Sequence, residues 1–173
     1  MKEVLRKKYL LVRKNISDKE FRDSIIFFKV IYNKQVVRAN TILIYVSLNE
    51  EVDTKKLIEY FLSIGKKVAV PKILNGKMNF YYIESLSELR IGFKNILEPI
   101  NNRRVIDFSG SVSITPGICF SKKLYRIGYG MGFYDKFYQK NNVYKIGVCY
   151  KELLIEDDFS DIYDVAVDEI ITD

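Results

Sequence analysis

Residues 41–70, TILIYVSLNEEVDTKKLIEYFLSIGKKVAV, decide the fold because they hold a complete strand, helix and strand unit. Residues 42–46 form a short, continuous and β-rich apolar run, which is typical of a strand covered on both faces. Asp53 or Thr54 can cap the helix that follows, and residues 67–70 have the pattern of a second buried strand. Such a unit is the building block of α/β domains.

The same alternation continues through the rest of the chain. Residues 2–14, and a segment that begins with the capping box Ser17 to Glu20, predict two N-terminal amphipathic helices. Further strands are predicted at 78–83, 111–115, 143–150 and 165–172, further helical segments at 85–90 and 133–140, and proline stops at Pro71, Pro99 and Pro116. We therefore expect one domain over residues 1–173, a Rossmann-like three-layer α/β/α domain with a largely parallel or mixed central sheet.

Composition restricts the chemistry that the chain can perform. Histidine is absent, which removes the commonest general base, the usual zinc ligand and every Ser-His or Cys-His nucleophile pair. Cys119 and Cys149 lie in apolar or aromatic stretches without the spacing of a metal or redox motif, so we expect reduced core residues. Carboxylates, lysines, arginines, backbone amides and a magnesium ion remain available.

The charge and the N-terminal segment bear on partners and location. A formal net charge of +6 attracts polyanions in general, including nucleotides and nucleic acids. Lysines are spread along the whole chain and the aromatic residues lie mostly in apolar runs, which argues against a nucleic-acid face. Residues 1–17 contain no apolar run long enough for a signal peptide or a membrane span. We expect a cytoplasmic monomer with no membrane or nucleic-acid partner.

Residues 126–135, RIGYGMGFYD, concentrate three of the nine glycines of the chain, Gly128, Gly130 and Gly132. Glycine permits positive φ and close approach, so successive N–H groups can form a nest around an anion. A helix that starts near Gly132 would add a favourable dipole for phosphate. The pattern is neither a Walker A loop nor a dinucleotide fingerprint, because no Gly-Lys-Ser/Thr follows and the spacing is GxGxG after a loop.

The two ends of this stretch are charged. Arg126 can contact a phosphate through two hydrogen bonds. Asp135 can hold magnesium or simply cap the following helix, and a glycine-rich turn without a ligand is the plain alternative for the whole stretch. Together these parts favour a nucleotide-phosphate site with a metal.

At this point the sequence resembles the 5-formyltetrahydrofolate cyclo-ligase family, also called methenyltetrahydrofolate synthetase. Residues 126–135 are similar to the family's signature of a basic residue, GxGxG, two aromatics and an aspartate. Collinear features extend over nearly the whole chain: KEVLR at 2–6, IYVSLNEEVDT at 44–54, Pro71, MNFYYI at 78–83, Gly92 with ILEP at 96–99, and TPGICF at 115–120.

The resemblance implies a set of site residues. For ATP binding it implies Lys2, Arg6, Arg126, Gly128, Tyr129, Gly130, Met131, Gly132, Phe133 and Tyr134, of which Arg126 and Tyr134 would be catalytic. For folate binding it implies Val46, Glu51, Tyr129, Gly130, Met131, Gly132 and Phe133. For magnesium it implies Asp135 and Asp164.

Some positions depart from the family pattern. In the loop FSKKL at 120–124, Ser121 and Leu124 stand where the family usually has aspartate and glycine, which puts the loop conformation in question. Near the C-terminus Tyr163 replaces a histidine that often precedes the aspartate. Asp168 is a nearby rival of Asp164 for the metal.

The function that the resemblance implies is the ATP- and Mg²⁺-dependent cyclisation of 5-formyltetrahydrofolate to 5,10-methenyltetrahydrofolate, with release of ADP and phosphate. It would proceed through a phosphorylated formyl, or iminophosphate, intermediate and would make the chain a ligase of folate and one-carbon metabolism. The alternatives are a basic anion- or RNA-binding module without catalysis, and a sugar-phosphate isomerase or CoA-transferase-like enzyme that acts without ATP.

Overall fold

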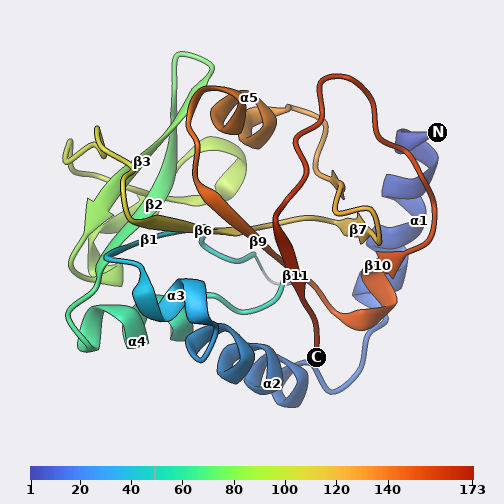
Figure 1. Cartoon of the computed structure of the whole chain (residues 1–173), viewed down its shortest axis with the longest axis horizontal. Helices are drawn as coiled ribbons and strands as arrows, with labels where there is room; N and C mark the ends of the chain where they lie inside the picture. The colour runs from blue at the N-terminus through green and yellow to red at the C-terminus, as the bar shows by residue number, and fades with distance from the viewer. Residues whose placement is uncertain (49) are drawn as a thin grey trace.

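A six-stranded sheet forms the centre of the molecule, and the computed structural model describes residues 1–48 and 50–173 (Figure 1). Asn49, in the motif at 44–54, lies outside the described residues. The strands are β1 Thr41–Ile44, β2 Lys67–Leu74, β3 Lys77–Ile83, β6 Ser111–Thr115, β9 Tyr144–Val148 and β11 Glu169–Ile171. Their order is β11-β9-β6-β1-β2-β3, and all neighbours are parallel except β2 and β3. The sheet is therefore largely parallel with one antiparallel edge strand, as predicted.

Helices cover both faces of this sheet. They are α1 Lys2–Lys14, α2 Lys19–Ile31, α3 Lys34–Arg38, α4 Lys55–Ser63 and α5 Phe133–Lys140. In Figure 1 α2, α3 and α4 lie on one side of the sheet and α5 lies on the other, which gives the predicted three layers. The short helix α3 was not predicted. Within the described part of the chain, no helix has the length and apolar character needed to cross a membrane.

Small elements border the central sheet. A hairpin pairs β4 Leu89–Ile91 with β5 Leu97–Pro99, and a second small sheet joins β7 Cys119–Ser121 to β8 Arg126–Ile127 and β10 Leu154–Ile155. Short 3-10 turns occupy Leu86–Glu88, Phe93–Asn95 and Lys151–Leu153. The second small sheet carries Arg126 toward α1, which lies beside it (Figure 1).

The loop after β1 is held by a buried threonine. Thr54 is the N-cap residue of α4, and its Oγ1 donates to the carbonyl of Tyr45 at 2.6 Å and accepts from the Ser47 N–H at 3.0 Å. Asp53 accepts from the Lys55 N–H at the start of α4 at 2.9 Å, whereas the Thr54 side chain makes no such capping bond. The buried hydroxyl of Thr54 is therefore satisfied both as donor and as acceptor, and it ties the start of α4 to the residues that directly follow β1.

Three local predictions were wrong. The capping box at Ser17 and Glu20 does not form, because Asp18 is the N-cap of α2, with φ of 54° and no side-chain cap bond. Pro71 does not end β2, which continues to Leu74. The pairing of β2 with β1 ends at Ala69, so Pro71 lies where one side of the strand has no ladder for its missing N–H to break. The final strand is also shorter than residues 165–172.

The ring of Phe120 packs in the core against Gly117 and Gly147, whose lack of a side chain leaves room for it. Phe120 is fully buried, and a Cβ on Gly117 or Gly147 would lie 2.6 Å or 2.4 Å from its ring. Cys119 and Cys149 are buried and free, as predicted, and burial raises the pKa of the Cys119 thiol to about 12. Neither thiol is therefore ionised at neutral pH.

Replacing Gly147 by Ala is expected to lower the free energy of unfolding by about 1–3 kcal/mol, because the added methyl meets the buried Phe120 ring. Denaturant unfolding measures the change. In a Phe120→Leu background the same Gly147→Ala change should cost less stability than it does in the wild-type chain. The comparison is between the double variant and Phe120→Leu alone. Unchanged stability of Gly147→Ala would contradict the packing described here.

Candidate active site

The main cavity lies at the carboxyl ends of the central parallel strands. The chain leaves β1 for β2 on one side and later places β6 on the other, so the direction of the strand order switches between β1 and β6. Ligands of open α/β sheets bind outside such a switch point. Here Tyr45 and Val46 after β1, and Pro116 and Gly117 after β6, line a cavity of about 440 Å³.

This cavity brings together all the residues that the sequence singled out for a site. They are Lys2 and Arg6 of α1, Val46 and Glu51 after β1, Arg126 of β8, the run from Gly128 to Tyr134, Asp135 of α5, and Asp164. Asp168 does not line it, since its carboxylate accepts from the Lys145 N–H at 2.6 Å and pairs with the Lys145 ammonium at 2.7 Å. Of the two rival carboxylates, Asp164 is the one placed at the cavity.

The glycine loop leads directly into a helix that starts at the cavity. Gly130 and Gly132 have φ of +91° and +63°, a conformation that a side chain would strain. Gly132 is the N-cap of α5, so the predicted helix start is confirmed and the free N–H groups of its first turn lie at the cavity wall. Arg6 supports the loop from α1, because its Nε donates to the Gly128 carbonyl at 2.8 Å.

Arg126 is a buried cation, and two of its nitrogens make no hydrogen bond to the described residues. Its Nη2 lies 2.9 Å from Asp135 Oδ2, and its guanidinium carbon lies 5.3 Å from the centre of the Tyr134 ring. Among the described residues, neither its Nε nor its Nη2 has a partner with hydrogen-bond geometry, and neither does the buried hydroxyl of Tyr134. Burial raises the pKa of that phenol well above its usual value. Unpartnered buried donors beside a cavity are groups that an anionic ligand would satisfy.

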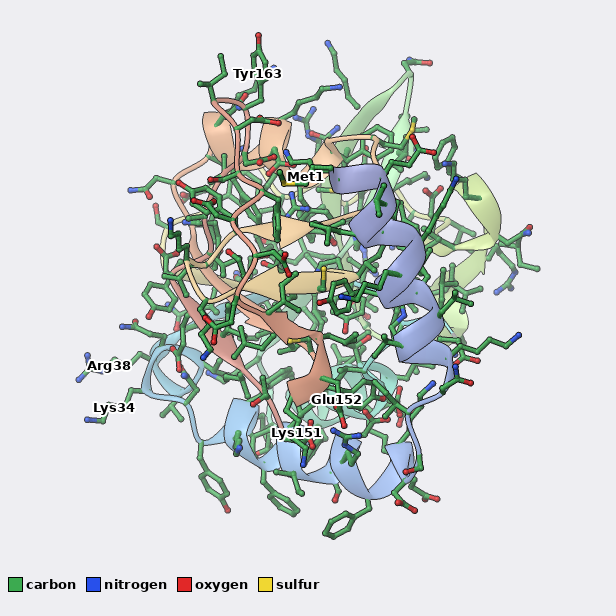
Figure 2. The ribbon with its side chains drawn as sticks, turned by 90° about the vertical axis from the view of Figure 1, so that its right-hand side faces the viewer. Met1, Lys34, Arg38, Lys151, Glu152 and Tyr163 are labelled. Carbon is green, nitrogen blue, oxygen red and sulfur yellow. The ribbon has the colours of Figure 1, made fainter. Side chains whose placement is uncertain are left out.

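Asp135 and Asp164 meet at the same end of the cavity. Asp135 Oδ1 accepts from the N–H of Val165, the residue after Asp164. Asp164 Oδ2 in turn accepts from the Lys2 ammonium at 2.5 Å and from the Asp161 N–H at 2.9 Å. Figure 2 shows the start of α1, labelled at Met1, on the side of the molecule that carries the loop of Tyr163.

The donors at this end of the cavity fit a magnesium nucleotide. No group of three or more potential ligands among His, Cys, Asp and Glu occurs in residues 1–48 and 50–173, so the chain shows no all-protein metal cage there. Mg²⁺ is commonly held by one or two carboxylates together with phosphate oxygens and water. Asp135 and Asp164 supply the two carboxylates of that arrangement, and the cations paired with them, Arg126 and Lys2, could contact the phosphates.

Glu51 presents a buried carboxylate to the other part of the cavity. Its side chain is 8% exposed and accepts from the Leu48 N–H at 2.9 Å and from the Tyr129 hydroxyl at 3.3 Å. Burial raises the pKa of this carboxyl, while the Leu48 N–H and the Arg13 guanidinium oppose the rise. Arg13 was missed in the sequence, where it looks like any basic residue of an amphipathic helix.

A model of the 5-formyltetrahydrofolate cyclo-ligase family matches residues 1–173. The chain belongs to this family. It is 32% identical over 145 residues to the 5-formyltetrahydrofolate cyclo-ligase of Escherichia coli. This match covers 79% of this chain and 80% of that protein. Over 145 residues it is 31% identical to a probable 5-formyltetrahydrofolate cyclo-ligase of Schizosaccharomyces pombe, which covers 70% of this chain and 71% of that protein.

A solved structure agrees with this membership. The 5,10-methenyltetrahydrofolate synthetase of Aquifex aeolicus has a TM-score of 0.86 and 28% identity, over 98% of this chain and 88% of that one. The predicted α/β fold is confirmed by this likeness. Membership in a family of cyclo-ligases makes the chain an enzyme, a ligase of folate metabolism.

One wall of the cavity in this family member was not predicted. It is apolar and comes from β2, β3 and the β4–β5 hairpin, through Pro71, Ile73, Met78, Phe93 and Ile96. The ring of Phe93 meets that of Phe133 edge-on at 5.9 Å between centroids. The motifs around Pro71 and Gly92 were the sequence signal for this wall. The pairing of β2 with β3 and of β4 with β5 is what places these side chains at the cavity.

The loop at residues 120–124, which departs from the family pattern, has a backbone conformation at Leu124 that favours glycine. Leu124 adopts φ of +71°, the left-handed region that the missing glycine would enter without strain. The strain of such a residue is about 1–2 kcal/mol. It is offset by packing of the leucine against the core and by hydrogen bonds to Ser121 and Val167, each at 2.9 Å. The substitution therefore leaves the turn before Arg126 intact.

Glu51→Gln is expected to raise the free energy of unfolding at neutral and alkaline pH. Because burial raises the folded-state pKa of this carboxyl above 4.5, the wild-type chain loses stability as pH rises through that pKa, and the neutral amide avoids the loss. Urea unfolding at about pH 5 and about pH 8 should show a gain that is larger at the higher pH, of about 1 kcal/mol per unit of pKa change.

Glu50→Gln is the matched control, because the adjacent carboxyl has the opposite shift. Its ion pair with Lys19 lowers the pKa of Glu50, so the charge contributes stability above the unfolded pKa, and that stability is lost as pH falls. This variant should be slightly less stable than wild type at about pH 8. The same sign of change in both variants would contradict the assigned shifts.

Proposed function

We propose that this chain catalyses the ATP- and Mg²⁺-dependent cyclisation of 5-formyltetrahydrofolate to 5,10-methenyltetrahydrofolate, with release of ADP and phosphate. Family membership supports the folate reaction. One observation carries the nucleotide part of the proposal: the buried Arg126, whose Nε and Nη2 make no hydrogen bond to the described residues, lies beside a glycine loop that opens the helix α5.

The chemistry explains why a phosphoryl donor is needed. The carbon of an N-formyl group is a poor electrophile, and its oxygen is a poor leaving group. Transfer of the γ-phosphoryl group from ATP to the formyl oxygen forms an O–P bond, releases ADP and gives an iminophosphate. The folate N10 then attacks the activated carbon, loses its proton and expels phosphate, which closes the ring.

The cations of the site would act on the transferred group. Arg126 and the N–H groups from Gly128 to Tyr134 would stabilise the charge that develops on the phosphoryl oxygens. Lys2 and Arg6, at the start of α1, would hold the remaining phosphates. Tyr134, whose hydroxyl is buried and unpartnered within the described chain, would donate to the formyl or phosphoryl oxygen, and no histidine is required.

Asp135 and Asp164 would hold the magnesium ion. When bound, the ion supplies positive charge that neutralises the ATP phosphates. The two carboxylates are paired here with Arg126 and Lys2, the same cations that the phosphates would attract. Nucleotide binding would thus exchange ion pairs within the site instead of burying new unpaired charges, which would be costly.

The folate would occupy the part of the cavity around Glu51. The carboxylate of Glu51 is an acceptor suited to the N–H donors of a pterin. Val46, the glycine loop and the apolar wall that includes Ile73 and Phe93 offer contact surface for the aromatic rings.

The direct test mixes the purified chain with Mg-ATP and 5-formyltetrahydrofolate and follows the near-ultraviolet band of the methenyl product. Product should form only when both ATP and magnesium are present, with one ADP per product. Absence of an ATP-dependent signal would overturn the proposal.

Arg126→Met should reduce kcat/KM for ATP by about 10- to 100-fold, because a charge-assisted hydrogen bond contributes about 1.5–3 kcal/mol. The assay above measures the loss, and thermal unfolding checks that the variant folds. Arg38→Met is the matched control, since this exposed arginine of α3 does not line the cavity and lies apart from Met1 (Figure 2). Equal kinetics for both variants would remove Arg126 from the site.

Asp135→Asn should raise the magnesium concentration needed for half-maximal activity by about tenfold, the effect of losing about 1.4 kcal/mol of ion binding. Its folding should be preserved, because the asparagine oxygen can still accept from the Val165 N–H. Asp168→Asn is the control, since Asp168 is paired with Lys145 away from the cavity. A magnesium defect in Asp168→Asn alone would reverse the assignment.

A further inference from the structure

Arg13 is a buried cation behind the cavity wall. It lies in the last turn of α1, is 4% exposed and does not line the main cavity. Its Nη2 donates to the Tyr129 hydroxyl at 2.6 Å. Within the described part of the chain, its Nε and Nη1 have no hydrogen-bond partner. A fully buried arginine is rare in proteins unless it is paired, so its placement calls for a reason.

The partners of Arg13 belong to the two loops that form the folate part of the site. The Tyr129 hydroxyl donates onward to Glu51 Oε1 at 3.3 Å, and Arg13 Nη1 lies 3.9 Å from the same oxygen. The cluster of Arg13, Tyr129 and Glu51 therefore joins α1, the glycine loop and the loop after β1. A small cavity of about 10 Å³ lies beside it, lined by Arg13, Glu51 and Tyr45 among others, with room for about one water.

We propose that Arg13 is a positioning residue that keeps Glu51 an ionised acceptor for the pterin ring and fixes Tyr129 of the glycine loop. The inference rests on the proposed function, because it assigns a task to the carboxylate that would bind folate. Arg13 itself does not reach the substrate. It acts from behind the wall, through Glu51 and Tyr129.

The surroundings of Glu51 leave Arg13 as its source of positive charge. Among the described residues, the titratable groups that face this carboxylate are Arg13 and the phenols of Tyr129, Tyr45 and Tyr134. Burial raises the pKa of each of these phenols, so they stay neutral in the working range. Burial also raises the pKa of Glu51, and Arg13 opposes that rise. Without Arg13 a larger fraction of Glu51 would be protonated, and a protonated carboxyl offers the pterin a donor in place of an acceptor.

The test measures binding of 5-formyltetrahydrofolate by calorimetry, without ATP, from about pH 6 to about pH 9. Arg13→Met should weaken folate binding by about 10- to 100-fold at the acidic end, and the loss should shrink as pH rises and Glu51 ionises. Arg13→Lys, which keeps the charge, should restore a flat profile. Lys14→Met, an exposed neighbour on the same helix, is the control for net charge and should bind like wild type.

Two readouts separate positioning from general damage to the fold. In Arg13→Met the loss of Mg-ATP binding should be smaller than the loss of folate binding and independent of pH, because Arg13 reaches the glycine loop through the Tyr129 hydroxyl alone among the described residues and lies outside the main cavity. Equal losses of ATP and folate binding, or a folate profile identical to wild type, would overturn the inference. If Arg13→Met does not fold, Tyr129→Phe replaces it, because loss of the hydroxyl removes a hydrogen bond to Glu51 and should shift folate binding in the same direction with pH. No shift in Tyr129→Phe would count against the proposal.

The failure of this inference is distinct from failure of the proposed function. A wild-type chain that makes no methenyl product contradicts the function. A wild-type chain that makes the product, with an Arg13→Met variant that binds folate normally at every pH, contradicts only the role of Arg13.

Discussion

Parallel pairing of β1 with β2 on one side and β6 on the other is the constraint on which the rest of the structure depends. Parallel strands end at the same edge of a sheet, so the loops after β1 and β6 open side by side. The cavity forms there, where the strand order switches direction. The buried Thr54 bonds back to Tyr45 and Ser47 just after β1, and Glu51 lies at the cavity.

The first helix completes the site from outside the sheet. Lys2, Arg6 and Arg13 follow one another along α1, and each contacts a segment of the site. Lys2 contacts Asp164, Arg6 contacts the carbonyl of Gly128, and Arg13 contacts Tyr129. A helix with basic residues on its inner face is unusual for a structural element, because buried charges lower stability unless they are paired. In this chain the partners are the loops that would bind substrate.

Three cations at or behind the cavity each lie next to a carboxylate. Arg126 pairs with Asp135, Lys2 pairs with Asp164, and Arg13 lies beside Glu51. These three cations thus each have a nearby carboxylate, so their charges are compensated inside the protein, whereas Arg6 contacts the carbonyl of Gly128. The donors of Arg126 that lack hydrogen-bond partners show where the compensation is incomplete. Such buried unsatisfied donors favour binding of an anion.

The sequence by itself determined the strands of the central sheet, the helices other than α3 and the glycine loop, because apolar periodicity and local motifs report backbone conformation directly. The set of residues that share one cavity came from the resemblance to the family. The sequence could not determine that Pro71 continues a strand, that Leu124 takes a left-handed φ, or that Arg13 is buried behind Glu51. Those features depend on contacts between segments far apart in the chain, namely the end of β1 beside β2, the Leu124 carbonyl with Val167, and α1 against the glycine loop. Only the tertiary structure decides them. Long-range packing determines that β2 has no β1 partner beyond Ala69, that the strain of Leu124 is offset, and that the charge of Arg13 lies beside Glu51.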